Sequence, residues 1–212
     1  METVYISENA YPDTLRHISS AGAVIKLISH DSRLGKFTGD HPDLRLAAVG
    51  GRAVFSPEED WRPDYPGNAA FCAVVLDGVL LHRLDLTSPR LLEAAAGYEL
   101  VNVRQGYAKC SSVTVDGRSL ITSDPGICRA AVCCGLDVLR VEAGGVLLPG
   151  YPEGFLGGAT GRVRDEIVFN GSLEAHPDRD AIRAFIKERG LGIWEASGLP
   201  LRDIGSIIYT YQ

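Results

Sequence analysis

The sequence lacks the features that mark membrane-spanning, exported and nucleic-acid-binding proteins. No apolar run approaches the roughly 20 residues of a membrane-spanning helix. The opening residues METVYISENAYP have neither a basic start nor an apolar core, so we expect no export signal. The net charge is −6, which argues against an extended nucleic-acid-binding surface. These absences leave an unidentified small ligand or another protein as the expected partner.

Cysteine is scarce, and its number is odd. There are five cysteines in 212 residues, and a chain of this length buries enough apolar surface to fold without disulfides. We therefore predict a reduced, cytoplasmic protein. Cys128, Cys133 and Cys134 fall on one predicted helix at a spacing that no zinc motif uses. We expect these three cysteines and Cys72 to be small buried core residues.

No motif for a metal or a cofactor stands out. The five histidines do not cluster at the spacing of metal ligands. His30–Asp31 and Asp40–His41 lie in a polar segment that we expect to be a solvated loop. The run GFLGGATG at 154–161 is followed by a predicted strand rather than a helix, and it lacks Gly-Lys-Ser/Thr, which argues against a phosphate-binding loop. The sequence therefore predicts no metal and no cofactor.

Proline and glycine are plentiful and follow a repeating order of strand, tight turn, strand, helix and strand. The stretch 154–197 shows the order most clearly. Its run EIVFNGSL predicts a hairpin around Asn170–Gly171, because Asn-Gly suits a turn with two positive φ angles. A helix then opens at His176–Pro177 and stops before Gly190, and a new strand starts at Ile193–Trp194.

Related patterns recur along the whole chain. Two-residue turns are predicted at 50–51, 77–78, 116–117 and 170–171, and helical elements start at Pro12, Pro57, Pro89, Pro125 and Pro177. The element at Pro57 is limited to one turn, because Pro63 and Pro66 follow it. The first copy lacks its leading strand, and a strand within 203–211 is left over at the other end.

Joining these two terminal strands would complete a fifth unit and close a ring, which removes exposed sheet edges. The predicted fold class is therefore α/β. We expect a single domain over residues 1–212, built of five units of about three strands plus one helix and closed by the N- and C-terminal strands. A doubly wound sheet would not carry a two-residue hairpin in every unit.

This repeat pattern resembles the pentein fold, the α/β propeller of guanidino-group-modifying enzymes. Three motifs resemble an uncharacterised bacterial family assigned to that fold. They are QGYAKCSS at 105–112, LPGYPEGFLGGATG at 148–161 and DIGSII at 203–208. The resemblance implies the fold and no particular reaction, because one fold supports many functions.

The resemblance also implies that residues needed for guanidino chemistry are absent. Active penteins use a histidine and a nucleophilic cysteine. The resemblance places Tyr107 at the position of the histidine and Ile208 at that of the cysteine, with Ser206 two residues earlier. A tyrosine, with an ordinary pKa near 10, is a poor proton shuttle. We therefore predict that the protein does not hydrolyse arginine, agmatine or methylated arginines.

Two functional interpretations remain open. In the first, the protein binds a small ligand or a macromolecule near the ring axis and carries out no guanidino chemistry. The ribosome anti-association factor, a pentein of comparable length, likewise lacks guanidino chemistry. The candidate ligand-binding residues are then Tyr107, Lys109, Cys110, Tyr151, Glu153, Asp203 and Ser206. The alternative is an enzyme of the amidinotransferase or hydrolase type, with a rearranged site formed by Lys109, Cys110, Asp203 and Ser206. In that case the Lys109 ammonium would lower the pKa of the Cys110 thiol.

The glycines of the run at 154–161 fit either interpretation. They predict close backbone approach or a bulge beside the ring axis. If the loop instead contacts a substrate, Tyr151 and Glu153 supply its polar groups.

Overall fold

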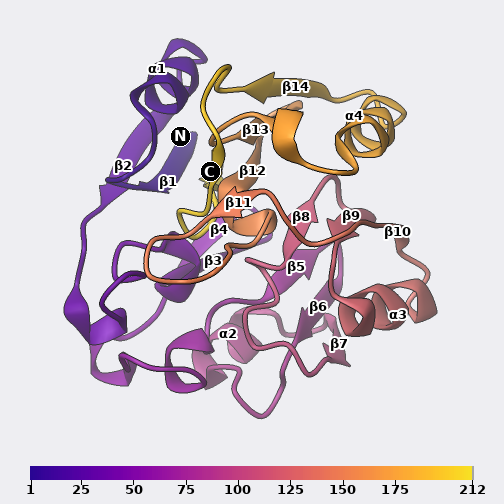
Figure 1. The fold of residues 1–212 in the computed structure, drawn as a ribbon. Helices are drawn as coiled ribbons and strands as arrows, with labels where there is room; N and C mark the ends of the chain where they lie inside the picture. The colour runs from indigo at the N-terminus through magenta and orange to yellow at the C-terminus, as the bar shows by residue number, and fades with distance from the viewer. Residues whose placement is uncertain (212) are drawn as a thin grey trace.

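Among residues 1–211, four three-stranded sheets share one pattern of connections (Figure 1). The computed structural model describes residues 1–211. One sheet contains β5 (Val74–Leu76), β6 (Val79–His82) and β7 (Glu99–Asn102), with helix α2 (Pro89–Ala94) between the last two strands. β5 and β6 are antiparallel, and β7 is parallel to β6. The helix therefore serves as the crossover that a parallel pair requires.

Two further sheets repeat this pattern. The first comprises β8 (Ser112–Thr114), β9 (Ser119–Thr122), α3 (Pro125–Cys133) and β10 (Asp137–Arg140). The second comprises β12 (Thr160–Val163), β13 (Glu166–Phe169), α4 (Arg179–Lys187) and β14 (Gly192–Glu195). In α3 the Asp124 side chain accepts hydrogen bonds from the first-turn N–H groups of Gly126 and Ile127, as expected of a helix cap.

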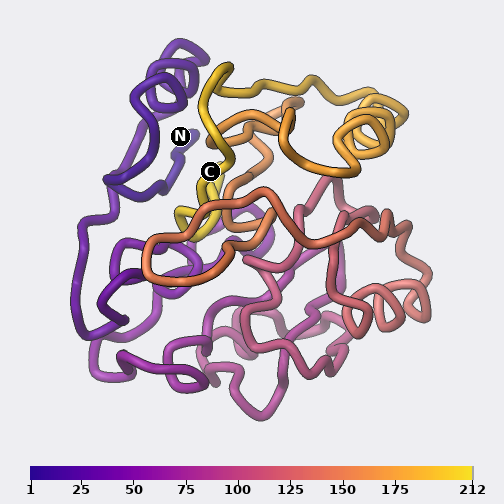
Figure 2. The backbone as a smooth tube through the Cα atoms, in the orientation of Figure 1, coloured from indigo at the N-terminus to yellow at the C-terminus, as the bar shows by residue number. Residues whose placement is uncertain are grey.

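The two ends of the chain share a sheet. It contains β16 (Ile208–Thr210), β1 (Thr3–Ser7) and β2 (Val24–Ile28), with α1 (Pro12–Ser20) between β1 and β2. β16 is antiparallel to β1, with Tyr5 opposite Ile208, and β1 is parallel to β2. Figure 2 shows the chain running round the molecule until its ends lie together. The predicted pairing of the terminal strands is therefore confirmed.

Two smaller sheets complete the structure. β3 (Leu46–Val49) and β4 (Arg52–Phe55) form the predicted hairpin, and both turn glycines, Gly50 and Gly51, have positive φ. The helical element after Pro57 is one 3-10 turn at 58–60, as the following prolines predict, and a second 3-10 turn follows at 67–69. β11 (Val146–Leu147) pairs with β15 (Leu201–Arg202) in parallel, and the sequence pattern did not predict this pair.

The predicted hairpin around Asn170–Gly171 is wrong. The hairpin of that unit is β12–β13, which turns at Arg164–Asp165 with a positive φ at Arg164. The buried Asn170 instead joins distant segments. Its Oδ1 accepts hydrogen bonds from the Tyr11 N–H and the Thr14 hydroxyl, and its Nδ2 donates to the Arg202 carbonyl. A tertiary role therefore explains this asparagine, and α4 starts at Arg179 rather than at Pro177.

The apolar core lies between neighbouring sheets. Ile182 and Ile186 of α4, for example, pack with Phe169 of β13 and with Ile121 of the preceding sheet. In five of the sheets, one edge strand contacts the corresponding edge strand of the next sheet. The order of these contacts is β16, β3, β5, β8 and β12, and β12 also contacts β16. Among residues 1–211, no helix is long and apolar enough to cross a membrane.

The prediction that all the cysteines of α3 are buried is wrong. Cys133 is exposed, and Cys128 and Cys134 are only partly buried. The buried face of α3 is formed by Ile127 and Ala131, which are four residues apart and so lie on one side of the helix. Cys133 lies off this face, whereas the partly buried Cys134, at the end of the helix, packs against the core cluster of Ile127 and Ala131. Cys72 is buried, as predicted.

Candidate functional site

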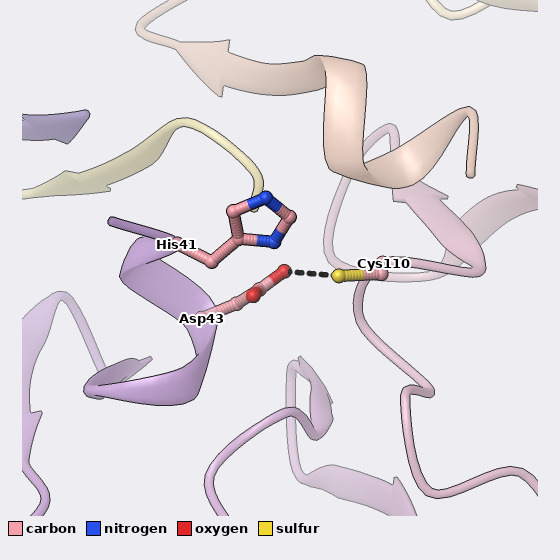
Figure 3. A group of neighbouring side chains, drawn as sticks. All are labelled: His41, Asp43 and Cys110. Carbon is pink, nitrogen blue, oxygen red and sulfur yellow. Dashed lines mark hydrogen bonds between the residues drawn. The ribbon is translucent and has the colours of Figure 1, made fainter. Parts of the chain in front are cut away.

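A buried carboxylate, Asp43, is the centre of a polar cluster that joins distant parts of the chain. Asp43 lies in a 3-10 turn, 42–44, whose proline suits the first helical position. Its Oδ2 atom accepts hydrogen bonds from the Cys110 thiol at 2.8 Å and from the Ser206 hydroxyl at 2.7 Å. Its Oδ1 atom is buried and has no hydrogen-bond partner among residues 1–211. Figure 3 shows Asp43 and Cys110 facing each other beside His41.

Ser206 is held in an unusual backbone conformation. It has a φ of 71°, and only one other non-glycine residue within 1–211 has a positive φ. A left-handed conformation costs a residue with a side chain about 1–2 kcal/mol. The hydroxyl lies 2.7 Å from Asp43 Oδ2 and 3.0 Å from the Gly157 carbonyl, so its one proton can be donated to only one of them at a time. Strained residues of this kind concentrate at functional sites.

Lys109 connects the cluster to a cavity. Its ammonium donates a hydrogen bond to the Ser206 hydroxyl at 3.3 Å. Burial lowers the pKa of Lys109 below its usual range. Lys109 also lines a cavity of about 750 Å³, and residues of β3, β5, β8, β12 and β16 are among those that form its other walls. This volume is that of a typical small-molecule pocket.

His41 and Asp203 complete the cluster. The His41 Nδ1 atom lies 3.9 Å from Asp203 Oδ1, and both side chains are buried. Asp203 accepts hydrogen bonds from the N–H groups of Phe155 and Gly205, at 2.9 and 3.0 Å. Burial raises the pKa of Asp203 above its usual range. Asp203 thus fixes two loops and lies next to the histidine.

The prediction that Asp40–His41 is solvated is therefore wrong. Asp40 is buried and accepts hydrogen bonds from the side chains of Ser7 and Asn9. The segment is polar because its side chains form hydrogen bonds with other residues inside the protein. A polar sequence by itself does not distinguish such internal hydrogen bonds from exposure to solvent.

The glycine-rich run explains how the backbone comes so close to these side chains. A Cβ atom on Gly157 would lie 2.5 Å from the Cys110 carbonyl oxygen, and one on Gly158 would lie 2.0 Å from Asp203 Oδ1. The Gly158 N–H donates to the Cys110 carbonyl at 2.9 Å. The prediction of close backbone approach is confirmed, since a side chain at either glycine would displace the site.

The Cys110 thiol is not activated in this state. Its hydrogen bond with Cys72, and then its burial, raise the pKa of Cys110 well above its usual range. The predicted lowering of this pKa by Lys109 is therefore wrong. The carboxylates of Asp43 and Asp203 also oppose a negative charge on this sulfur, whereas reactive cysteines have electropositive surroundings.

The remaining predicted site residues lie around or away from the cluster. Tyr107 packs in the same apolar cluster as Cys110, and its hydroxyl donates to Asn68 at 2.8 Å. Tyr151 is 53% exposed and contacts Phe37. Glu153 is exposed, at a small cavity that His176 also lines. The structure thus groups Lys109, Cys110, Asp203 and Ser206, and leaves Tyr151 and Glu153 outside.

Sequence reasoning missed His41 and Asp43. Their only signal is the tripeptide His-Pro-Asp, in which proline starts a turn and places the flanking side chains at its beginning. Ile208, two residues after Ser206, packs with Tyr5 and Leu46, so this strand position belongs to the apolar core.

The comparisons with known proteins agree with this architecture. Dimethylarginine dimethylaminohydrolase, in the crystal structure of its adduct with 4-chloro-2-hydroxymethylpyridine, is similar with a TM-score of 0.55 and 9% identity over 91% of each chain. That enzyme has the pentein fold, and at this identity the similarity shows the fold alone. No curated protein sequence matches the chain. Residues 50–208 match the sequence model of a family of unknown function, DUF6873. The chain therefore belongs to this family, and its structure is a mixed α/β fold similar to that of the penteins.

Proposed function

We propose that this protein binds a small anionic ligand, such as a carboxylate or a phosphate ester, in the cavity of about 750 Å³ beside Lys109. The observation that carries the proposal is the state of the Lys109 ammonium. It has three N–H donors and one hydrogen bond, to Ser206. Among residues 1–211 it forms no ion pair with a carboxylate. The two remaining donors are available to an anion.

We further infer that the cavity lies on the axis of a five-unit propeller. The cyclic order of contacts among β16, β3, β5, β8 and β12 supports this arrangement, as does the pairing of β16 with β1. The cavity is lined by residues of these strands, among them Leu46 of β3, Val75 of β5 and Thr114 of β8. An axial site of this kind receives side chains from every unit.

The rest of the cavity suits a compact ligand with both polar and apolar parts. Phe71, Ala73 and Ile207 provide apolar wall, and Arg162 adds a second cation. Arg162 lies 3.7 Å from Asp165, a mostly exposed carboxylate, so its charge is only weakly compensated. The wall is of mixed polarity and also carries carboxylates. Glu2 pairs with Arg164, and Asp77 and Asp165 line the same cavity.

The proposal is tested with inorganic phosphate, citrate and malonate as probes, by isothermal titration calorimetry in chloride-balanced buffer. We expect at least one probe to bind the wild-type protein. Lys109→Met should weaken it by about tenfold or more, since a direct charged contact is lost. Lys109→Arg should retain part of the affinity. Lys187→Met, which removes an exposed lysine at the end of α4, is the control and should change nothing. Equal affinity in Lys109→Met and the control would refute the proposal.

Thiol chemistry at Cys110 is a second candidate, because the structure brings Cys110, His41 and Asp43 together. Attack on a guanidinium carbon requires the thiolate, and the raised pKa of Cys110 opposes its formation. We therefore expect no citrulline, ornithine or free amine from arginine, agmatine or methylated arginines. Turnover that disappears in Cys110→Ser would establish this second candidate instead.

A further inference from the structure

Three buried side chains present a nitrogen, an oxygen and a sulfur atom to one small volume. His41, Asp43 and Cys110 each offer one such atom, and all of these atoms lie within 4.8 Å of one another (Figure 3). We propose that these residues form a binding site for a divalent transition-metal ion, with Zn²⁺ as the preferred ion. No linear motif predicts the site, because Cys110 is 67 positions from Asp43.

An unpaired oxygen atom supports the proposal independently of the grouping. Asp43 is 1% exposed. Within the part of the chain that the structure describes, its Oδ1 atom has no hydrogen-bond partner, whereas Oδ2 has two. A buried carboxylate oxygen without a partner is costly, and native proteins rarely retain one. A bound cation would give this carboxylate the partner that the protein chain does not provide.

The set of donor atoms selects the kind of metal. Mg²⁺ and Ca²⁺ are bound by six or more oxygen atoms, and this site offers one carboxylate. An imidazole, a carboxylate and a thiolate are typical ligands of Zn²⁺. Zinc bonds of about 2.0–2.3 Å in tetrahedral geometry separate ligand atoms by roughly 3.3–3.8 Å. Starting from separations of at most 4.8 Å, side-chain shifts of about 1 Å bring the ligands into place.

The backbone of the three ligands is already fixed. The His41 N–H donates to the Thr38 carbonyl at 3.0 Å, and the Asp43 N–H donates to the Gly205 carbonyl at 3.1 Å. The Cys110 carbonyl accepts from the Gly158 N–H at 2.9 Å. Little chain entropy would therefore be lost when the metal binds, which favours affinity.

The protons and charges balance on binding. The S–H bond of Cys110 breaks, the sulfur keeps the electron pair and forms the Zn–S bond, and the proton passes to water. Zn²⁺ with one thiolate, one carboxylate and one neutral imidazole carries no net charge, which suits a buried site. Three protein ligands leave a fourth position for water. Because Lys109 is not a ligand, this inference does not depend on anion binding in the cavity.

The first test is a zinc titration of the full-length protein after removal of metal with a chelator. Calorimetry in the presence of a competing chelator should show one ion per chain. His41→Ala, Asp43→Asn and Cys110→Ser should each weaken binding by more than about 100-fold, because each removes a direct ligand. Cys133→Ser removes an exposed thiol and should leave the affinity within about twofold of wild type. Zinc affinity that is unchanged in His41→Ala or Asp43→Asn would overturn the proposal.

The second test needs no variant to fold. Wild-type protein loaded with Co²⁺ should show a thiolate-to-cobalt charge-transfer band in the near-ultraviolet and the visible bands of a four-coordinate ion. Excess Zn²⁺ should remove both sets of bands. The absence of a charge-transfer band, or its loss in Cys133→Ser alone, would overturn the assignment of Cys110 as a ligand.

Discussion

The backbone strain at Ser206 gives a prediction in which the usual order of two substitutions is reversed. At ordinary positions alanine is more stable than glycine by about 0.5–1 kcal/mol. At Ser206 the φ of 71° penalises any residue with a Cβ atom by about 1–2 kcal/mol. Glycine still costs about 0.4–1 kcal/mol through the greater freedom of the unfolded chain. We therefore expect Ser206→Gly to be more stable than Ser206→Ala by about 1 kcal/mol.

Both variants should be less stable than the wild type. Each loses the hydroxyl that lies 2.7 Å from Asp43, and a hydrogen bond to a charged group contributes about 1.5–3 kcal/mol. Alanine keeps the strain and loses this full amount, whereas glycine recovers about 1 kcal/mol of it. The unfolding free energies should therefore fall in the order wild type, Ser206→Gly, Ser206→Ala.

Equilibrium unfolding in urea measures this order, with fluorescence of Trp61 and Trp194 as the signal. A difference of 1 kcal/mol shifts the midpoint by about 0.3–1 M. The control pair is Ser19→Gly and Ser19→Ala, at an exposed position inside α1, where alanine should be the more stable by about 1 kcal/mol. If alanine were also the more stable residue at position 206, the backbone conformation assigned to Ser206 would be wrong.

Three further predictions concern the terminal strand, the thiols and acid stability. Deletion of residues 203–212 removes β16 and exposes the edge of β1, so the truncated protein should show no cooperative thermal transition, and an unchanged melting curve would contradict this. A thiol reagent should label Cys133 first in the native protein and reach Cys72 and Cys110 only after denaturation, as mass spectrometry of digests will show. Burial lowers the pKa of His82, so the unfolded chain binds its proton more readily. The free energy of unfolding should therefore fall as the pH drops below about 6.5, and His82→Gln should flatten this dependence.

Local sequence signals identified most elements of the fold because their causes are local. Proline fixes a φ that suits the first turn of a helix, and α1, α2 and α3 start at Pro12, Pro89 and Pro125. Glycine accommodates positive φ in the turn at Gly50–Gly51 and after helices. The pairing of the C-terminal strand with β1 was predictable as well. The complete units showed that the first unit lacks its leading strand, and the C-terminal strand was the one left over.

Local rules failed where a residue is used for tertiary contacts. Asn170–Gly171 has the composition of a tight turn, but Asn170 is buried and its amide joins α1 to the segment before β16. Cys133 is exposed because the packing of α3 selects the face of Ile127 and Ala131. A sequence window contains neither the partner of a side chain nor the surface against which a helix packs.

The polar site itself was decided by the tertiary structure. The sequence pointed to Lys109, Cys110, Asp203 and Ser206 separately, through motifs at two positions in the chain. It gave no sign that the loop of His41 and Asp43 is buried between them. That loop is held at the site by a hydrogen bond from the Asp43 N–H to the Gly205 carbonyl, which joins the first and last quarters of the chain. The direction of the Cys110 pKa shift follows from the same packing, since it depends on Cys72 and on burial rather than on the neighbouring lysine.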